Sequence, residues 1–192
     1  RSDQGHIHDT ILGLAHDNDI VISYGLCEYA NSTYYNAQAL MGPYGLIGVQ
    51  HKVHASGDEY FYFRMGRKFH VFDLGFCTIG TLICFDVTFF EAWRALALMG
   101  ADVLLLPHAA RSGRGSEVPT EQQEEVIRKM LDDTKSNSGY TSANAAYARF
   151  ANQFGYNGHS THGGGVYVLD PSGEQIARGE PVLENQMILT EI

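Results

Sequence analysis

The sequence has few cysteines, no long apolar run and no cluster of basic residues. Its three cysteines, Cys27, Cys77 and Cys84, form neither a disulfide framework nor a CxxC zinc pattern, so we expect reduced thiols in a cytoplasmic protein. No run could span a bilayer, and the start contains no signal-peptide core. The formal net charge of -9, with dispersed Lys and Arg residues, argues against a nucleic-acid partner. We therefore expect no membrane or nucleic-acid partner.

What is present is typical of a globular domain. Apolar residues make up 44% of the 192 residues and charged residues 18%, and no stretch has the composition of a linker. This length is sufficient for one domain with a substantial core. We expect residues 1–192 to form a single domain.

Hydrophobic periodicity predicts alternating helices and strands. The continuous apolar run 101–107 is typical of a strand in a sheet that is covered on both faces, which indicates the α/β class. Gly100 ends the helix before it, and a polar, Gly-rich excursion over the surface follows it. The expected helices are 4–16, 88–99 and 121–133; the expected strands are 19–28, 34–41, 45–53, 68–75, 76–84, 101–107, one after the glycines at 163–165, and two after the turn 170–173, the last ending at 188–192.

Cys84 lies where a buried strand is expected to give way to a helix. Asp86 and Thr88 supply helix-starting side chains, and the apolar positions that follow recur at helical spacing. Unpaired peptide N–H groups at a helix start favour a thiolate and a neighbouring oxyanion, so Cys84 is a candidate nucleophile. The alternative is a small buried hydrophobe, since free cysteines are among the most buried residue types.

Other polar residues give weaker signals. The nine histidines include three close pairs, but no HExxH or Cys/His pattern accompanies them, so we expect no metal site. The glycines at 163–165 precede a strand and not a helix, so they do not form a phosphate-binding loop. Lys52 closes an expected strand, a few residues before Asp58 and Glu59. A lysine in that position, taken alone, is usually a solvated strand end.

Taken together, these segments resemble the nitrilase superfamily of carbon-nitrogen hydrolases. The resemblance rests on GLCEYANSTYYNAQALMGPYGLIGVQHKVH, GDEYFYFRMGRKFHVFDLG, IGTLICFDVTFFEAWRALALMGADVLLLP and HGGGVYVLDPSGE, in this order, and covers nearly the whole chain. It implies an α/β fold of the four-layer α-β-β-α sandwich type. It also implies a hydrolase that cleaves a non-peptide carbon-nitrogen bond.

The resemblance also implies roles for particular residues. Cys84 falls on the nucleophile of a motif like I-C-Y-D-x-x-F-P-E, Lys52 on the lysine of Y-R-K-x-H, and Glu59 on the glutamate of G-E-x-x-x-F. Lys52 and the peptide N–H of Phe85 would hold the oxyanion. His54 and Asp86, from the same motifs, are the other expected oxyanion-side or substrate-binding residues. No cofactor and no metal are implied.

The sequence also departs from the family pattern. The family's first catalytic residue is a glutamate on an earlier strand, so we expect this chain to lack the N-terminal strand-helix-strand that carries it; Glu28 follows a different strand and is not assigned that role. Phe85 replaces the usual tyrosine, Phe90 a common proline, and Tyr140 a frequent arginine, whereas Asn144 is retained. These changes leave the substrate open.

We therefore expect a cysteine hydrolase of a small-molecule amide or N-carbamoyl compound, with a nitrile as the less favoured substrate. The resemblance also implies a homo-oligomer, although this sequence stops at ILTEI, where family members often continue into a tail that packs on a partner subunit. This chain alone is expected to be inactive. The alternative is a non-catalytic relative that uses the same sandwich for binding or assembly.

Overall fold

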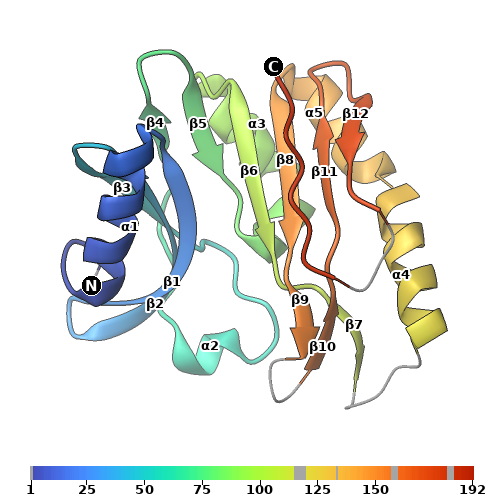
Figure 1. The fold of residues 1–192 in the computed structure, drawn as a ribbon, viewed down its shortest axis with the longest axis horizontal. Helices are drawn as coiled ribbons and strands as arrows, with labels where there is room; N and C mark the ends of the chain where they lie inside the picture. The colour runs from blue at the N-terminus through green and yellow to red at the C-terminus, as the bar shows by residue number, and fades with distance from the viewer. Residues whose placement is uncertain (1, 115–119, 133, 157–159, 181–183) are drawn as a thin grey trace.

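The computed structural model describes residues 2–114, 120–132, 134–156, 160–180 and 184–192. Two β-sheets face each other, and helices cover the outer face of each one (Figure 1). The layers therefore follow the order α-β-β-α, which confirms the expected sandwich.

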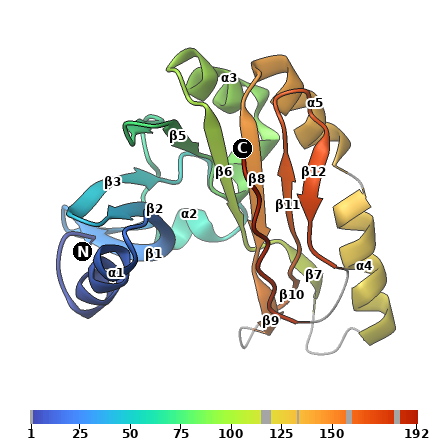
Figure 2. The same ribbon diagram turned by 45° about the horizontal axis from the view of Figure 1, so that its top comes forward.

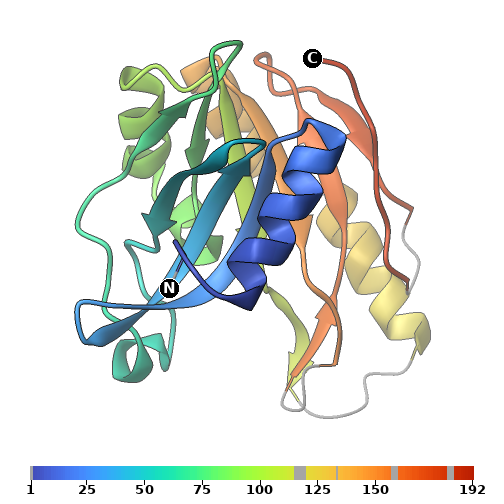
Figure 3. The ribbon, with the colours of Figure 1, turned by 60° about the vertical axis from the view of Figure 1, so that its left-hand side comes forward.

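The first sheet is an antiparallel meander of β1 (Ile22–Ala30), β2 (Thr33–Gly42) and β3 (Gly45–His51). Helix α1 (His6–Asn18) lies across its outer face (Figure 3). The β2–β3 hairpin turns at Pro43 and Tyr44, and Gly45 adopts the positive φ of 139° that the turn requires. Both expected strands and their turn are confirmed.

The second sheet has six strands in the order β12-β11-β8-β6-β5-β4. At its centre β6 pairs in parallel with β5 and β8, as an apolar run buried on both faces predicts. The bounds of its strands are β4 Val71–Asp73, β5 Thr78–Thr81, β6 Val103–His108, β8 Tyr147–Asn152, β11 Val166–Leu169 and β12 Gln175–Arg178.

Helices α3 (Phe90–Leu98), α4 (Thr120–Asp132) and α5 (Lys135–Asn144) cover the outer face of this sheet (Figure 2). Trp93 and Leu96 of α3 are fully buried there against the sheet. This packing forms the main hydrophobic core.

Short elements connect the layers. A four-residue helix, α2 (Glu59–Tyr62), follows β3, and a five-residue 3₁₀ turn, η1 (Cys84–Thr88), follows β5. Strands β7 (Arg111–Arg114), β9 (Phe154–Tyr156) and β10 (Ser160–Gly163) form a small third sheet in the order β7-β10-β9. The excursion expected after β6 therefore contains a strand, and its residues 115–119 lie outside the described residues.

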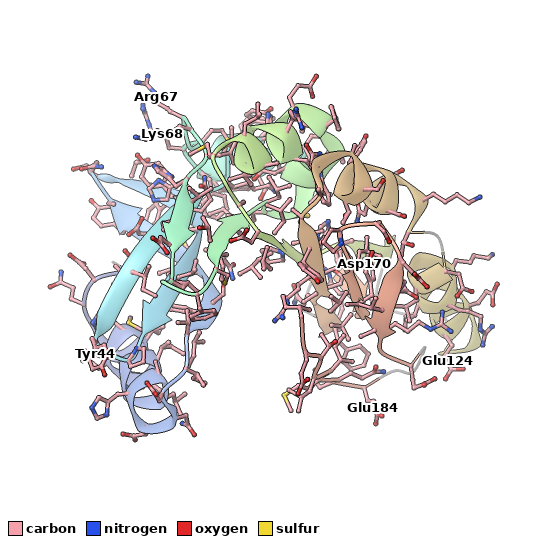
Figure 4. The ribbon with its side chains drawn as sticks, turned by 90° about the horizontal axis from the view of Figure 1, so that it is seen from above. Tyr44, Arg67, Lys68, Glu124, Asp170 and Glu184 are labelled. Carbon is pink, nitrogen blue, oxygen red and sulfur yellow. The ribbon has the colours of Figure 1, made fainter. Side chains whose placement is uncertain are left out.

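The inner faces of the two large sheets diverge and form a cleft. Figure 4 shows them as two arms, with Tyr44 on one and Asp170 and Glu184 on the other. A cavity of about 1130 Å³ lies between the arms. Paired sheets normally interdigitate at a separation of about 10 Å, so this interior is not close-packed. Its apolar lining includes Leu40, Ile47, Ile79, Val103 and Leu105.

Two of the expected elements differ from the structure. Residues 185–192 form no strand, although their apolar pattern predicts one. Met187 and Leu189 are more than 80% exposed there, so the segment lacks the partner against which a strand would pack. The helix expected from residue 88 begins at Phe90, because the chain first makes the turn η1.

Candidate active site

Lys52 follows the last residue of β3 and is almost completely buried, with 2% of its side chain exposed. Its Nζ donates a hydrogen bond to Glu59 Oε2 at 2.5 Å. A buried ammonium is stable only when it is paired, so Glu59 compensates the charge of Lys52. Lys52 is therefore not the solvated lysine that is usual at the end of a strand.

Glu59 is itself held by two further donors. Asn36 Nδ2 donates to its Oε1 at 2.9 Å, and the peptide N–H of Ser56 donates to its Oε2 at 2.6 Å. With Lys52, these bonds fix both carboxylate oxygens. The Lys52 ammonium is therefore held by an anion that cannot easily rotate away.

Cys84 opens the turn η1 and is half-buried. Its φ of 50° lies in the left-handed region that residues with a Cβ rarely adopt. Backbone strain of this kind is frequent at active sites, including the turns that expose a nucleophile. Cys84 thus lies where a strand gives way to helical structure, as expected, but the first turn is a 3₁₀ turn and the α-helix begins six residues later.

Asp86 connects the turn of Cys84 to the segment that follows Lys52. Its carboxylate is fully buried and accepts hydrogen bonds from the peptide N–H of Ile83 at 3.1 Å and of His54 at 2.8 Å. His54 Nδ1 lies 2.8 Å from the same carboxylate. Burial raises the pKa of Asp86, and these hydrogen bonds oppose the rise. Asp86 thus joins the two segments that carry the candidate nucleophile and lysine.

His54 and Phe85 border this junction. The His54 ring stacks on Phe89 with centroids 3.9 Å apart, and Phe85 meets Phe89 edge-on at 5.4 Å. Phe85 is 38% exposed. The structure therefore brings Lys52 and Glu59 into direct contact, and His54 and Asp86 likewise, while Cys84 and Phe85 share the turn that Asp86 anchors.

His108 is a candidate that the sequence analysis missed. It ends β6, and ligands of α/β sheets commonly bind beyond the carboxyl ends of parallel strands. Burial lowers its pKa; its contact with the Leu106 carbonyl opposes this, and the neighbouring Lys52 ammonium lowers the pKa further. Because Nδ1 lies 3.1 Å from that carbonyl, it carries the proton and Nε2 keeps a lone pair. The signal in the sequence was a histidine closing an apolar strand.

The neutral state of His108 predicts a pH dependence of stability. Because its pKa in the folded state is depressed, its contribution is present above about pH 6.5 and is lost as pH falls through the folded pKa. We expect the free energy of unfolding, measured with urea, to fall less between pH 7 and 5 in His108→Gln than in the unmodified chain. The control is His16→Gln, which changes a histidine 68% exposed on α1. If the free energy of unfolding fell equally between pH 7 and 5 in the unmodified chain and in His108→Gln, the neutral state assigned to folded His108 would be wrong.

The three thiols are free and differ in their surroundings. Cys27 is exposed, so its thiol cannot serve as a buried control for Cys84. Cys77 is half-buried, and burial raises its pKa, with a further rise from Asp102. Cys77 is therefore the less reactive reference for Cys84 near neutral pH.

The described residues contain no group of three or more His, Cys, Asp or Glu residues placed to bind a metal ion. No helix among them has both the length and the apolar composition needed to cross a membrane.

Comparison with known proteins places this arrangement in a family. The family model described as carbon-nitrogen hydrolase matches residues 3–192. N-carbamoylputrescine amidase of Solanum tuberosum is 31% identical over 96% of this chain and 66% of its own length, and a nitrilase of Pyrococcus abyssi is 39% identical over 57% and 44%. The carbon-nitrogen hydrolase of Helicobacter pylori G27 superposes with a TM-score of 0.78 at 24% identity, over 93% of this chain and 64% of its own.

The chain thus spans two thirds or less of the length of these relatives. The family model nevertheless matches it almost from end to end, through the segments that contain Lys52, Glu59 and Cys84. On these findings, the chain belongs to the carbon-nitrogen hydrolases of the nitrilase superfamily.

Proposed function

We propose that this protein hydrolyses a small amide or N-carbamoyl compound through an acyl-enzyme on Cys84. The observation that carries the proposal is the buried Lys52–Glu59 pair, joined through Asp86 to the strained turn of Cys84. A nitrile is the less favoured substrate, because the relative named as a nitrilase aligns with 57% of the chain and the N-carbamoylputrescine amidase with 96%.

In the first half-reaction, the Cys84 thiolate attacks the carbonyl carbon and a tetrahedral species forms. Its oxyanion is held by the Lys52 ammonium and the peptide N–H of Phe85. The carbon-nitrogen bond then breaks, the amine or ammonia leaves with a proton, and a thioester remains on Cys84. Glu59 keeps the ammonium in position through both events.

In the second half-reaction, water attacks the thioester carbonyl. The carbon-sulfur bond breaks, the acid product leaves, and the thiol takes back a proton. Both half-reactions need a base, because the thiol and the water must each give up a proton. Glu59 already accepts hydrogen bonds from three donors, so the base is expected to be another group.

We further propose that this base comes from an upstream strand-helix-strand, whose strands would border the cleft between the sheets. The size of the cavity supports this, and so does Arg149, whose Nε is buried beside the cleft without a hydrogen-bond partner among the described residues. A buried guanidinium nitrogen without a partner is unfavourable, so an acidic group from the proposed upstream segment is expected opposite it. β1, at the edge of its sheet, offers a pairing position.

Two further features belong to this proposal. The free thiols are consistent with a cytoplasmic location. We also propose a homo-oligomer, and light scattering on the purified protein would measure its mass directly.

The test combines reactivity and turnover. In a Cys27→Ser background, brief iodoacetamide treatment of the folded protein should label Cys84 before Cys77, as read by mass spectrometry. In the protein with its native upstream sequence, the same treatment should abolish ammonia release from a panel of amides and N-carbamoyl compounds. A substrate that does not react with Cys84→Ala but reacts with Cys77→Ala would establish the nucleophile. First labelling of Cys77, or full activity of Cys84→Ala, would contradict the proposal.

A further inference from the structure

A second buried carboxylate, Glu28, pairs with His51 on the face of the first sheet opposite to Lys52. Glu28 of β1 is 6% exposed, and its Oε2 lies 2.5 Å from His51 Nε2. Its other oxygen accepts hydrogen bonds from the hydroxyl of Ser2 and from the peptide N–H of Ser2 at 3.3 Å. The family assignment gives no role to this cluster.

His51 and Lys52 are consecutive, and side chains alternate between the two faces of a strand. The same alternation occurs on the neighbouring strand β2. Tyr35 stacks on the His51 ring with centroids 4.0 Å apart and planes 10° from parallel, whereas Asn36 points the other way and binds Glu59. Each of the residue pairs Tyr35–Asn36 and His51–Lys52 thus places its first side chain beside Glu28 on one face of the sheet and its second side chain in the Lys52 site on the other face.

The backbone between the two faces has little freedom. The Lys52 N–H donates to the Asn36 carbonyl at 2.8 Å, and the Lys52 carbonyl accepts from the Gly66 N–H at 2.7 Å. Gly66 packs so closely that a Cβ there would lie 2.6 Å from the His51 carbonyl oxygen. A movement of the His51 ring would therefore be transmitted to Lys52 and not absorbed locally.

The carboxylate of Glu28 is suited to hold that ring. Burial alone would raise its pKa, but the hydrogen bonds with Ser2 and His51, together with the charge of His51, lower the pKa overall. Glu28 thus remains an anion at neutral pH. The ring is held from two directions, by this anion at its Nε2 edge and by Tyr35 on its flat side.

We propose that Glu28 and His51 are positioning residues, which set the place of the Lys52 ammonium from the opposite face of the sheet. This inference rests on the proposed function of Lys52 as an oxyanion donor. Because an oxyanion exists only during reaction, a displaced ammonium lowers turnover more than substrate binding. Neither residue contacts the substrate.

A double-mutant cycle in the protein with its native upstream sequence tests the coupling. We expect Glu28→Gln to lower kcat about tenfold per folded molecule, with KM within about twofold, a loss in the range caused by a small misplacement. In a Lys52→Met background, Glu28→Gln should lower kcat by less than about twofold, because its effect acts through Lys52. An equal fall in kcat per folded molecule in both backgrounds would show that Glu28 does not act through Lys52, and a loss of stability alone would leave this kcat unchanged; either result overturns the inference.

A second measurement does not depend on catalysis. The ¹⁵N resonance of Lys52 Nζ, assigned by its loss in Lys52→Met, should shift in Glu28→Gln and return toward its original value in Glu28→Asp. The matched control is Asp17→Asn, which removes another carboxylate beside a histidine, here the exposed His16–Asp17 pair at 3.3 Å. That control should leave the Lys52 resonance unchanged.

The two measurements separate the failure of this inference from the failure of the proposed function. If no substrate is hydrolysed but the resonance shifts, Glu28 positions Lys52 and the proposed function is wrong. If Glu28→Gln leaves the resonance unchanged, the inference is wrong, whatever the activity. Should Glu28→Gln fail to fold, Ser2→Ala can replace it, because it removes only the hydroxyl that donates to the Glu28 carboxylate. We expect a smaller shift of the Lys52 Nζ resonance in Ser2→Ala, and an unchanged resonance would show that the inference is wrong.

Discussion

Lys52→Met is expected to lower turnover of the protein with its native upstream sequence by about a hundredfold or more, the size typical of one lost oxyanion donor. Methionine keeps most of the buried stem of the side chain but removes the ammonium. KM should change little, because the oxyanion that Lys52 would hold is absent from the bound substrate. Ammonia release under saturating substrate measures the effect.

The burial of Lys52 requires a stability control. Removing its charge leaves the Glu59 carboxylate without its cation, and breaking a buried pair from one side costs about 3–5 kcal/mol. Lys52→Met/Glu59→Gln removes both charges and should recover part of the melting temperature without recovering turnover. Lys129→Met, at a lysine 75% exposed on α4, should change neither quantity. Activity retained in Lys52→Met would remove this residue from the mechanism.

Local sequence signals predicted the elements that position the site. Gly42, Pro43 and Gly45 specify the hairpin that leads β3 to Lys52, because their backbone preferences fit a tight turn. The apolar run that became β6 predicted a parallel strand, since both of its faces are covered. These features depend on residues that are close in sequence.

Contacts between distant residues could not be predicted in this way. Asp86 reads as a helix-starting residue, but its carboxylate binds the backbone at His54, 32 positions earlier. This attachment accompanies the 3₁₀ turn in place of an α-helix. Glu28 and His51 lie 23 positions apart, and their pairing follows from the register of three strands. No periodicity in the sequence encodes either contact.

Helix α5 was missed for a different reason. Its sequence KSNSGYTSAN is polar and lacks a clear apolar stripe. Its helical conformation is supported by packing, because Tyr140 meets Phe90 at 5.4 Å and Trp93 at 5.6 Å. Tertiary contacts thus outweigh weak local preference in this segment.

The upstream segment is expected to have a large effect on turnover. We expect the 192 residues alone to release ammonia negligibly, whereas the version extended through the family's first strands is active. A thiol with an ordinary pKa of about 8.5 needs a base or a positive field for efficient attack near neutral pH. The left-handed turn of Cys84 fixes its geometry, but the α-helix that would supply a field begins six residues later.

The same extension should change stability and solubility. The apolar walls of the cleft and the edge strand β1 would be exposed in the 192 residues alone, and such surfaces promote aggregation. The extended version should therefore have the higher melting temperature and remain monodisperse. Its Arg149→Met variant should lose part of that gain, because the expected acidic partner of Arg149 would then be buried without a cation. Equal ammonia release from both versions, each confirmed to be folded, would show that the base lies within the 192 residues, and His108 would be the first residue to replace.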